Sequence, residues 1–218
     1  MPRESRQQLL ERWNQIRTTL RTTYPNAHCE LTHSNPLELL IATILSAQCS
    51  DAQVNRVTPN LFRKYPSALH YAQASLPQLE SDLKQIGLFR SKARNIKSCA
   101  QSLVDQHQGH VPNSMDQLIR LAGVGRKTAN VVLGNAFNQI EGIVVDTHVA
   151  RLSTRFSLTR AKHPEKIEAD LTKITPREDW TLISHLLIFH GRRRCNARRP
   201  DCASCEVKTW CPSALPQN

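Results

Sequence analysis

The chain has 218 residues, of which 29 are Lys or Arg and 18 are Asp or Glu, so its formal net charge is +11. This length suffices to bury a hydrophobic core, in one large domain or two small ones. The positive charge favours a polyanionic partner, nucleic acid first, over a neutral metabolite. No apolar run has membrane-spanning length, and the N-terminus lacks a signal core, so we expect a cytoplasmic protein that needs no membrane and keeps its seven cysteines reduced.

Helical spacing of apolar residues accounts for the first half of the chain. The predicted helices cover residues 6–24, 36–47, 51–62, 76–87 and 91–109, with the second one apolar nearly all round. We expect Asn35, Ser50 or Asp51, and Ser91 to cap three of them, and Pro59 to kink the third. Gln48 then follows the buried second helix, and Leu88 lies on the corner before the fifth.

The segment LIRLAGVGRKTANVVLGNA, residues 118–136, has the pattern of two short helices joined by a tight turn. Gly123 and Gly125 allow the positive φ that such a turn needs, and the first backbone N–H groups of the second helix have no partner within it. The segment therefore predicts an anion site. The pattern alone leaves an ordinary helix–helix corner open, whereas a nucleotide P-loop fits poorly because Arg126 stands where that motif has glycine.

Two residues near this hairpin are candidates for catalysis. Lys127 follows it directly and would place an amine nucleophile beside the phosphate-binding loop, and Asp146 comes nineteen positions later. Asp146 is expected to cap a helix over residues 147–156, and further helices are expected after His163-Pro164 and over residues 177–190. Because few segments alternate and the chain has only 7 glycines, we predict an all-α fold.

Four cysteines form a C-x6-C-x2-C-x5-C array near the C-terminus: Cys195, Cys202, Cys205 and Cys211. So compact a set of thiols indicates a metal site, and sulfur ligation suits either zinc or an iron-sulfur cluster. The other three cysteines have no ligand spacing. Five arginines lie in and beside the array with no acid between His190 and Pro200, which favours phosphate binding: Arg192, Arg193, Arg194, Arg198 and Arg199.

Taken in order, the segments LLIATILSAQ, IGLFRSKARNI, LAGVGRKTANVVL and VVDTHVARL and the cysteine array resemble the endonuclease III family of helix-hairpin-helix DNA glycosylases. The resemblance spans nearly the whole chain. It implies a six-helix domain over residues 29–140, with the hairpin at about 115–134. It also implies a second helical lobe from residues 1–28 and 141–218, with a [4Fe-4S] cluster, not zinc, held by the four cysteines of the loop at 195–211.

The resemblance further implies a bifunctional enzyme of base excision repair that acts as a monomer on double-stranded DNA with a damaged base or an abasic site. Lys127, as a neutral amine, would attack C1′ of an oxidised pyrimidine nucleotide that is flipped out of the stack, and expel the base. The resulting Schiff base would permit β-elimination on the 3′ side. Asp146 matches the family's catalytic aspartate, and would oppose positive charge on the sugar and assist proton transfer.

Gln48 and Leu88 match family positions that enter the duplex from opposite sides, where an apolar wedge replaces lost stacking. We expect the other DNA contacts to come from the hairpin, from the helix after Asp146 and from the cysteine array, namely from Gly123, Gly125, Arg126, Thr128, His148, Arg193, Arg198 and Arg199. Two residues depart from the family pattern. Ala122 stands where proline is common, and Cys49 stands where a small or hydroxyl residue is usual.

Two other functions compete with this interpretation. An adenine-type mismatch glycosylase without lyase activity typically carries tyrosine at the position of Lys127, and it has an extra domain for which the chain leaves no room after Cys211. A non-catalytic DNA-binding protein would have no use for Lys127 together with Asp146. The sequence does not say which lesion or opposite base is preferred, how the glycosylase and lyase rates compare, which proteins are partners, or whether the cluster has a redox role.

Overall fold

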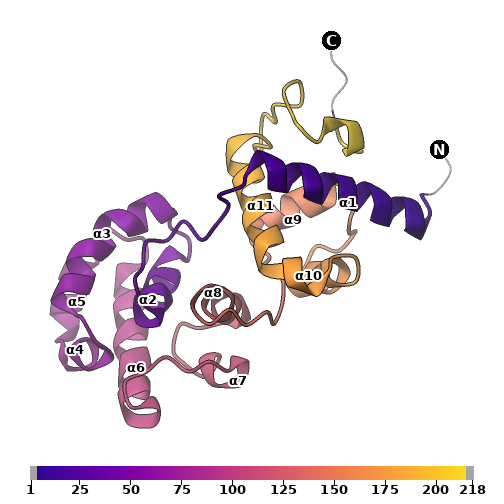
Figure 1. The fold of residues 1–218 in the computed structure, drawn as a ribbon. Helices are drawn as coiled ribbons and strands as arrows, with labels where there is room; N and C mark the ends of the chain where they lie inside the picture. Colours follow the sequence, from indigo (N-terminus) through magenta and orange to yellow (C-terminus); the bar gives the residue numbers. More distant parts are fainter. Residues whose placement is uncertain (1–3, 215–218) are drawn as a thin grey trace. The chain divides into compact units, whose positions relative to one another are not determined.

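The computed structural model describes residues 4–214, and these contain helices and loops but no β-strand (Figure 1). The predicted all-α fold is confirmed. The chain divides into two compact units, which we call the central unit, residues 29–141, and the terminal unit, residues 1–28 and 142–218. None of the helices within residues 4–214 combines the length and hydrophobicity that crossing a bilayer requires.

The central unit is built around a buried apolar helix. Its helices are α2 (Pro36–Ser46), α3 (Asp51–Lys64), α4 (Ala68–Gln73), α5 (Leu76–Asp82), α6 (Phe89–His107), α7 (Met115–Leu118) and α8 (Arg126–Ala136). Every residue of α2 from Leu39 to Leu45 is buried, because this helix packs against α3, α6 and α8. Asn35 caps it as predicted, by accepting the N–H of Glu38 at 3.0 Å.

The terminal unit joins the N-terminal helix to the C-terminal third of the chain. Its elements are α1 (Arg6–Thr23), α9 (Thr147–Arg155), α10 (Pro164–Thr172), η1 (Arg177–Asp179), α11 (Trp180–Arg193) and η2 (Lys208–Trp210). The apolar face of α1 supplies Trp13, Ile16 and Leu20, all fully buried, and α1 packs against α11 and η2. The indole N–H of Trp13 donates to the hydroxyl of Thr175 at 3.0 Å. Residues far apart in sequence therefore share one core.

Three local predictions were wrong. The cap of α6 is Leu88, not Ser91, and its backbone is left-handed, with φ 58° and ψ 30°. The short helix α4 was not predicted; it packs against α6, and the serine before it makes no capping hydrogen bond. Of the two hairpin glycines only Gly123 has positive φ, at 78°, whereas Gly125 is extended with φ −96° and ψ 175°.

Candidate active site, cluster loop and DNA-contact residues

The hairpin turn needs glycine at position 123 for two reasons. Its positive φ strains any other residue, and an added Cβ would lie 3.0 Å from Cβ of Asn95 on α6. Gly125, the N-cap of α8, instead has open space where a Cβ would be, and the helix begins with no capping side chain. A phosphate oxygen could therefore approach this backbone closely, as at other helix N-termini.

Lys127 is the second residue of α8 and its side chain is exposed. The helix is held firmly, because Ala129, Val132 and Leu133 are fully buried in the central core. Arg126 is exposed beside Lys127, while Thr128 is half-buried. An amine thus projects from a rigid helix immediately after the open turn, which is the arrangement that a positioned nucleophile requires.

Asp146 belongs to the terminal unit, where it caps α9 as predicted. Its Oδ1 accepts the N–H of Val149 at 2.8 Å. The preceding segment is anchored, since Ile143 and Val145 are buried and the N–H of Val144 donates to the hydroxyl of Ser184 at 3.0 Å. The carboxylate is half-buried and keeps its second oxygen for other partners.

His148, two residues after Asp146, packs against Gly191, a glycine that the sequence pattern did not single out. A Cβ added to Gly191 of α11 would lie 2.9 Å from Nδ1 of His148. Arg151 donates to that same nitrogen at 3.1 Å, to the carbonyl of Gly191 at 2.9 Å and to that of Cys195 at 3.1 Å. Burial lowers the pKa of His148. A glycine inside an otherwise apolar helix pattern is the sequence signal that marks such a close approach.

Gln48 and Leu88 lie on two loops of the central unit and both have left-handed backbones, with φ 54° and 58°. Both side chains are exposed, and Leu88 is 59% exposed, more than any other large hydrophobic residue that the structure describes. Strained, exposed residues of this kind cluster at functional sites. The two loops lie against each other, because a Cβ added to Gly87 would lie 3.6 Å from the carbonyl oxygen of Gln48.

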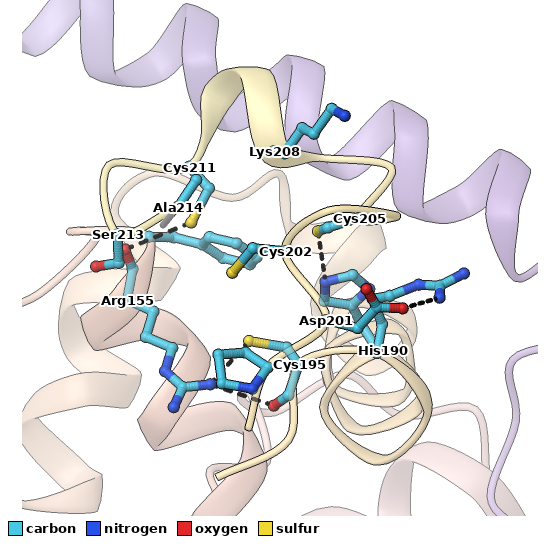
Figure 2. Close-up of a pocket in the computed structure, with 13 residues that line it drawn as sticks. Arg155, His190, Cys195, Asp201, Cys202, Cys205, Lys208, Cys211, Ser213 and Ala214 are labelled. Atoms are coloured by element: carbon cyan, nitrogen blue, oxygen red, sulfur yellow. Dashed lines mark hydrogen bonds and ion pairs between the residues drawn. The ribbon is translucent and has the colours of Figure 1, made fainter. Parts of the chain in front are cut away.

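All four clustered cysteines line one pocket of the terminal unit, and this space is partly open to solvent. Figure 2 shows their sulfurs arranged around this space. Within residues 4–214, no three His, Cys, Asp or Glu side chains are close enough to share a single ion. Four thiols on one pocket are a donor set that suits either a zinc ion or an iron-sulfur cluster.

Side chains of the helices hold the loop that carries these cysteines. Arg155, the last residue of α9, donates to Sγ of Cys195 at 3.0 Å and to the carbonyls of Asn196 and Ala197 at 2.8 Å each. His190 is fully buried, and its Nε2 lies 3.6 Å from Sγ of Cys205 (Figure 2). Arg155 lies 40 residues before Cys195, and neither supporting residue is part of the cysteine spacing, which is why the sequence pattern did not identify them.

Burial sets the protonation of this region. It lowers the pKa of His190 to about 4, so the imidazole is neutral at pH 7, and raises the pKa of Tyr24 to about 12, so that phenol keeps its proton. The hydroxyl of Tyr24 lies 3.1 Å from Nδ1 of His190. If this phenol donates, Nε2 carries the imidazole proton and points toward Cys205. Burial also raises the pKa of Cys205 to about 11 and raises that of Cys211, so a cation is needed to stabilise their thiolates.

The arginines around the array have different environments. Arg194 is bound to Asp201 at 2.6 Å and Glu206 at 2.9 Å, so acids beyond Pro200 neutralise it, contrary to the expectation of five uncompensated cations. The guanidinium of Arg193 stacks 3.8 Å above the ring centroid of Phe189. Arg198 and Arg199 are exposed and pair with no acid among the residues described. They fit a phosphate-contacting role best.

Residues 41–177, more than half of the chain, match the HhH-GPD superfamily of base excision DNA repair proteins. The matched range contains the hairpin, Lys127 and Asp146, and ends before the cysteine array. Fold and sequence together thus define a helix-hairpin-helix protein of the base excision repair class.

More specific similarities lie within this class. The chain is 47% identical to endonuclease III of Synechocystis sp. over 204 residues, which are 94% of this chain and 93% of that protein. It is also 47% identical to endonuclease III of Bacillus subtilis over 189 residues, 86% of each chain. A solved structure of a trapped endonuclease III–DNA covalent intermediate matches with a TM-score of 0.87 and 47% identity, covering 92% of this chain and 96% of that one. The chain belongs to the endonuclease III family.

Proposed function

We propose that this protein is a bifunctional DNA glycosylase and AP lyase, which removes oxidised pyrimidines from double-stranded DNA and cleaves the strand 3′ to the abasic site. The observation that carries the proposal is Lys127, an exposed amine on the first turn of α8, directly after an open glycine turn. The similar endonuclease III that was trapped as a covalent intermediate with DNA supports it. We place this activity on DNA in the cytoplasm.

The reaction follows from the two candidate catalytic residues. The lone pair of the Lys127 amine forms a bond to C1′ of the damaged nucleotide, while the glycosidic bond breaks and the base leaves with its electron pair. Loss of a proton from nitrogen and opening of the sugar ring give an imine. Removal of a proton from C2′ then expels the 3′ phosphate by β-elimination. We assign to Asp146 the stabilisation of the cationic sugar and the assistance of proton transfer.

The remaining site residues hold the substrate. Backbone N–H groups at Gly123 and Gly125, with Arg126 and Thr128, are proposed to bind phosphates at the start of α8. Gln48 and Leu88 are proposed to fill the space that the flipped nucleotide leaves and to wedge beside the orphan base. His148, Arg193, Arg198 and Arg199 would add contacts from the terminal unit.

We propose that Cys195, Cys202, Cys205 and Cys211 hold a [4Fe-4S] cluster. Two observations support this: the four thiols line one pocket, and burial raises the pKa of two of them, Cys205 and Cys211, so that their thiolates need a cation. When bound, the iron centres would supply the positive charge that stabilises the thiolates. The residues of this chain would then fix the loop that carries Arg198 and Arg199.

The function can be tested with three duplexes that carry thymine glycol, an abasic site or a mismatched adenine. Base release and strand cleavage should be resolved separately for each. We expect release and cleavage with thymine glycol, cleavage with the abasic site and no release of adenine. Release of adenine without cleavage would instead establish a monofunctional mismatch glycosylase.

Metal analysis tests the cofactor. Protein purified without air should be brown and contain about four irons per chain. Cys202→Ser should lose most of the iron, whereas Cys49→Ser, which changes a half-buried cysteine outside the pocket, should retain it. Stoichiometric zinc with no iron would contradict the cluster assignment.

The salt dependence of DNA binding tests the arginines. Log affinity should fall linearly with log salt, by about 0.9 per phosphate neutralised on duplex DNA. Replacing Arg198 and Arg199 together by alanine should therefore reduce the steepness of the slope by about 1.8, equally for damaged and undamaged DNA.

The matched control for this variant is alanine at Lys162 and Lys166, two exposed cations near the start of α10 in the same unit. It removes the same charge and should leave the slope close to that of the wild type. A changed lesion preference with an unchanged slope in the arginine variant would place Arg198 and Arg199 at the base pocket instead.

A further inference from the structure

Lys92, in the first turn of α6, is a lysine in an unusual environment, since it is only 4% exposed. Its Nζ donates to the carbonyl of Leu45 at 2.8 Å. Its backbone N–H donates to the carbonyl of Leu88 at 3.1 Å. One residue thus connects the end of α2, three positions before Gln48, to Leu88 itself.

The carbonyl that Lys92 binds needs a partner from outside its helix. Leu45 is the last residue but one of α2, so the helix contains no N–H four residues further on. The N–H of Cys49, which has that spacing, donates to Ser46 instead, at 3.1 Å. The C-terminal end of a helix carries partial negative charge, which favours a cation there. Burial disfavours that cation and lowers the pKa of Lys92.

Other contacts show that the two loops lie against each other. A Cβ on Gly87 would be 3.6 Å from the carbonyl oxygen of Gln48. The side-chain amide of Gln53, in the helix after Gln48, donates to the carbonyl of Gln85 at 3.2 Å. The left-handed backbones of Gln48 and Leu88 are therefore held side by side, with both side chains exposed.

This inference rests on the proposed function. We propose that Lys92 is a positioning residue for duplex penetration, whose side chain ties the end of α2 to the start of α6 and so makes the Gln48 and Leu88 tips one rigid unit. Separately mobile tips would each have to be ordered when DNA binds. A pre-formed pair avoids this ordering cost and keeps the nucleotide out of the DNA duplex, which places C1′ where the nucleophile can reach it.

Lys92→Met tests the hydrogen bond between Lys92 and Leu45, because methionine occupies a similar volume but donates no hydrogen bond. The matched control is Lys97→Met. Lys97 lies on the same helix and its Nζ likewise donates to main-chain carbonyls at a helix end. These are the carbonyls of Ala72 and Ala74 at the end of α4, at 2.5 and 2.6 Å, and not those of the two loops. Thermal melting of both variants measures the stability lost when a lysine that binds main-chain carbonyls is replaced.

Penetration is measured with a duplex that carries 2-aminopurine opposite a tetrahydrofuran abasic analogue, which cannot form an imine. Wild-type protein and Lys97→Met should raise the fluorescence by unstacking the probe, and Lys92→Met should raise it much less. Base release from thymine glycol should slow by about tenfold to a hundredfold in Lys92→Met, since small misplacement of reacting groups has effects of this size. Binding to undamaged duplex should change little.

Equal fluorescence and equal base release in Lys92→Met and Lys97→Met would overturn the proposal and leave Lys92 a purely structural residue. A wild type that neither releases thymine glycol nor unstacks the probe would overturn the proposed function as well. If Lys92→Met does not fold, Gly87→Val tests the same coupling from the surface, because its larger side chain pushes on the carbonyl of Gln48. Gly87→Ala, which the 3.6 Å spacing accommodates, is its control and should behave as the wild type.

Discussion

Lys127→Ala is expected to abolish base release and strand cleavage together. One amine forms the bond to C1′ and then carries the imine through elimination, so its removal stops both steps. Wild-type protein should become permanently attached to thymine glycol DNA when borohydride reduces the imine, and the variant should not. The attachment can be followed as a shifted band on a denaturing gel.

Lys127→Arg serves as the control for charge. It keeps a cation at the start of α8 and should bind lesion DNA about as well as the wild type, yet form no adduct. Because Lys127 is exposed, neither substitution disturbs the core, and both variants should melt like the wild type. Near wild-type release of thymine glycol by Lys127→Ala would mean that water is the nucleophile, and the lyase assignment would fail.

The parts of the fold that could be predicted from the sequence are those that local physics determines. Asn35 and Asp146 act as caps because their short side chains reach backbone N–H groups three residues ahead, whatever the rest of the chain does. The apolar run of α2 likewise predicts a buried helix by itself, because a helix that is apolar nearly all round has no face suited to solvent. Ser91 also matched a capping pattern, but α6 begins at Phe89, two residues earlier, since Leu88 takes a left-handed conformation beside the Gln48 loop.

The candidate site likewise contains residues that local motifs identify and residues that only the tertiary fold reveals. Lys127 and the four cysteines stand in compact motifs, so their residue types and spacing were enough to single them out. Lys92 and Arg155 were missed, because a lysine or arginine in a helix normally faces solvent and only the tertiary fold shows that these two bind main-chain carbonyls. The pairing of Arg194 was missed because Asp201 and Glu206 come after Pro200, beyond the arginine-rich stretch.

Asp146→Asn is the second substitution for which we expect a large effect, and it separates the two roles of this residue. Asparagine caps a helix about as well as aspartate, so its oxygen can still accept the N–H of Val149. The loss of negative charge at the start of α9 should cost only about 0.3–1 kcal/mol of stability. The variant should therefore fold and bind lesion DNA.

Its chemistry should nevertheless be slower by about 100- to 10,000-fold, because a neutral amide neither opposes positive charge on the sugar nor takes up a proton. Single-turnover measurement of borohydride adduct formation, beside a melting curve, gives both quantities. Asp146→Ala, which loses the cap as well as the charge, should react as slowly as Asp146→Asn and melt at a lower temperature. If Asp146→Asn reacts at the wild-type rate while Asp146→Ala melts early, the residue is a helix cap alone, and the acid–base role must belong to another group.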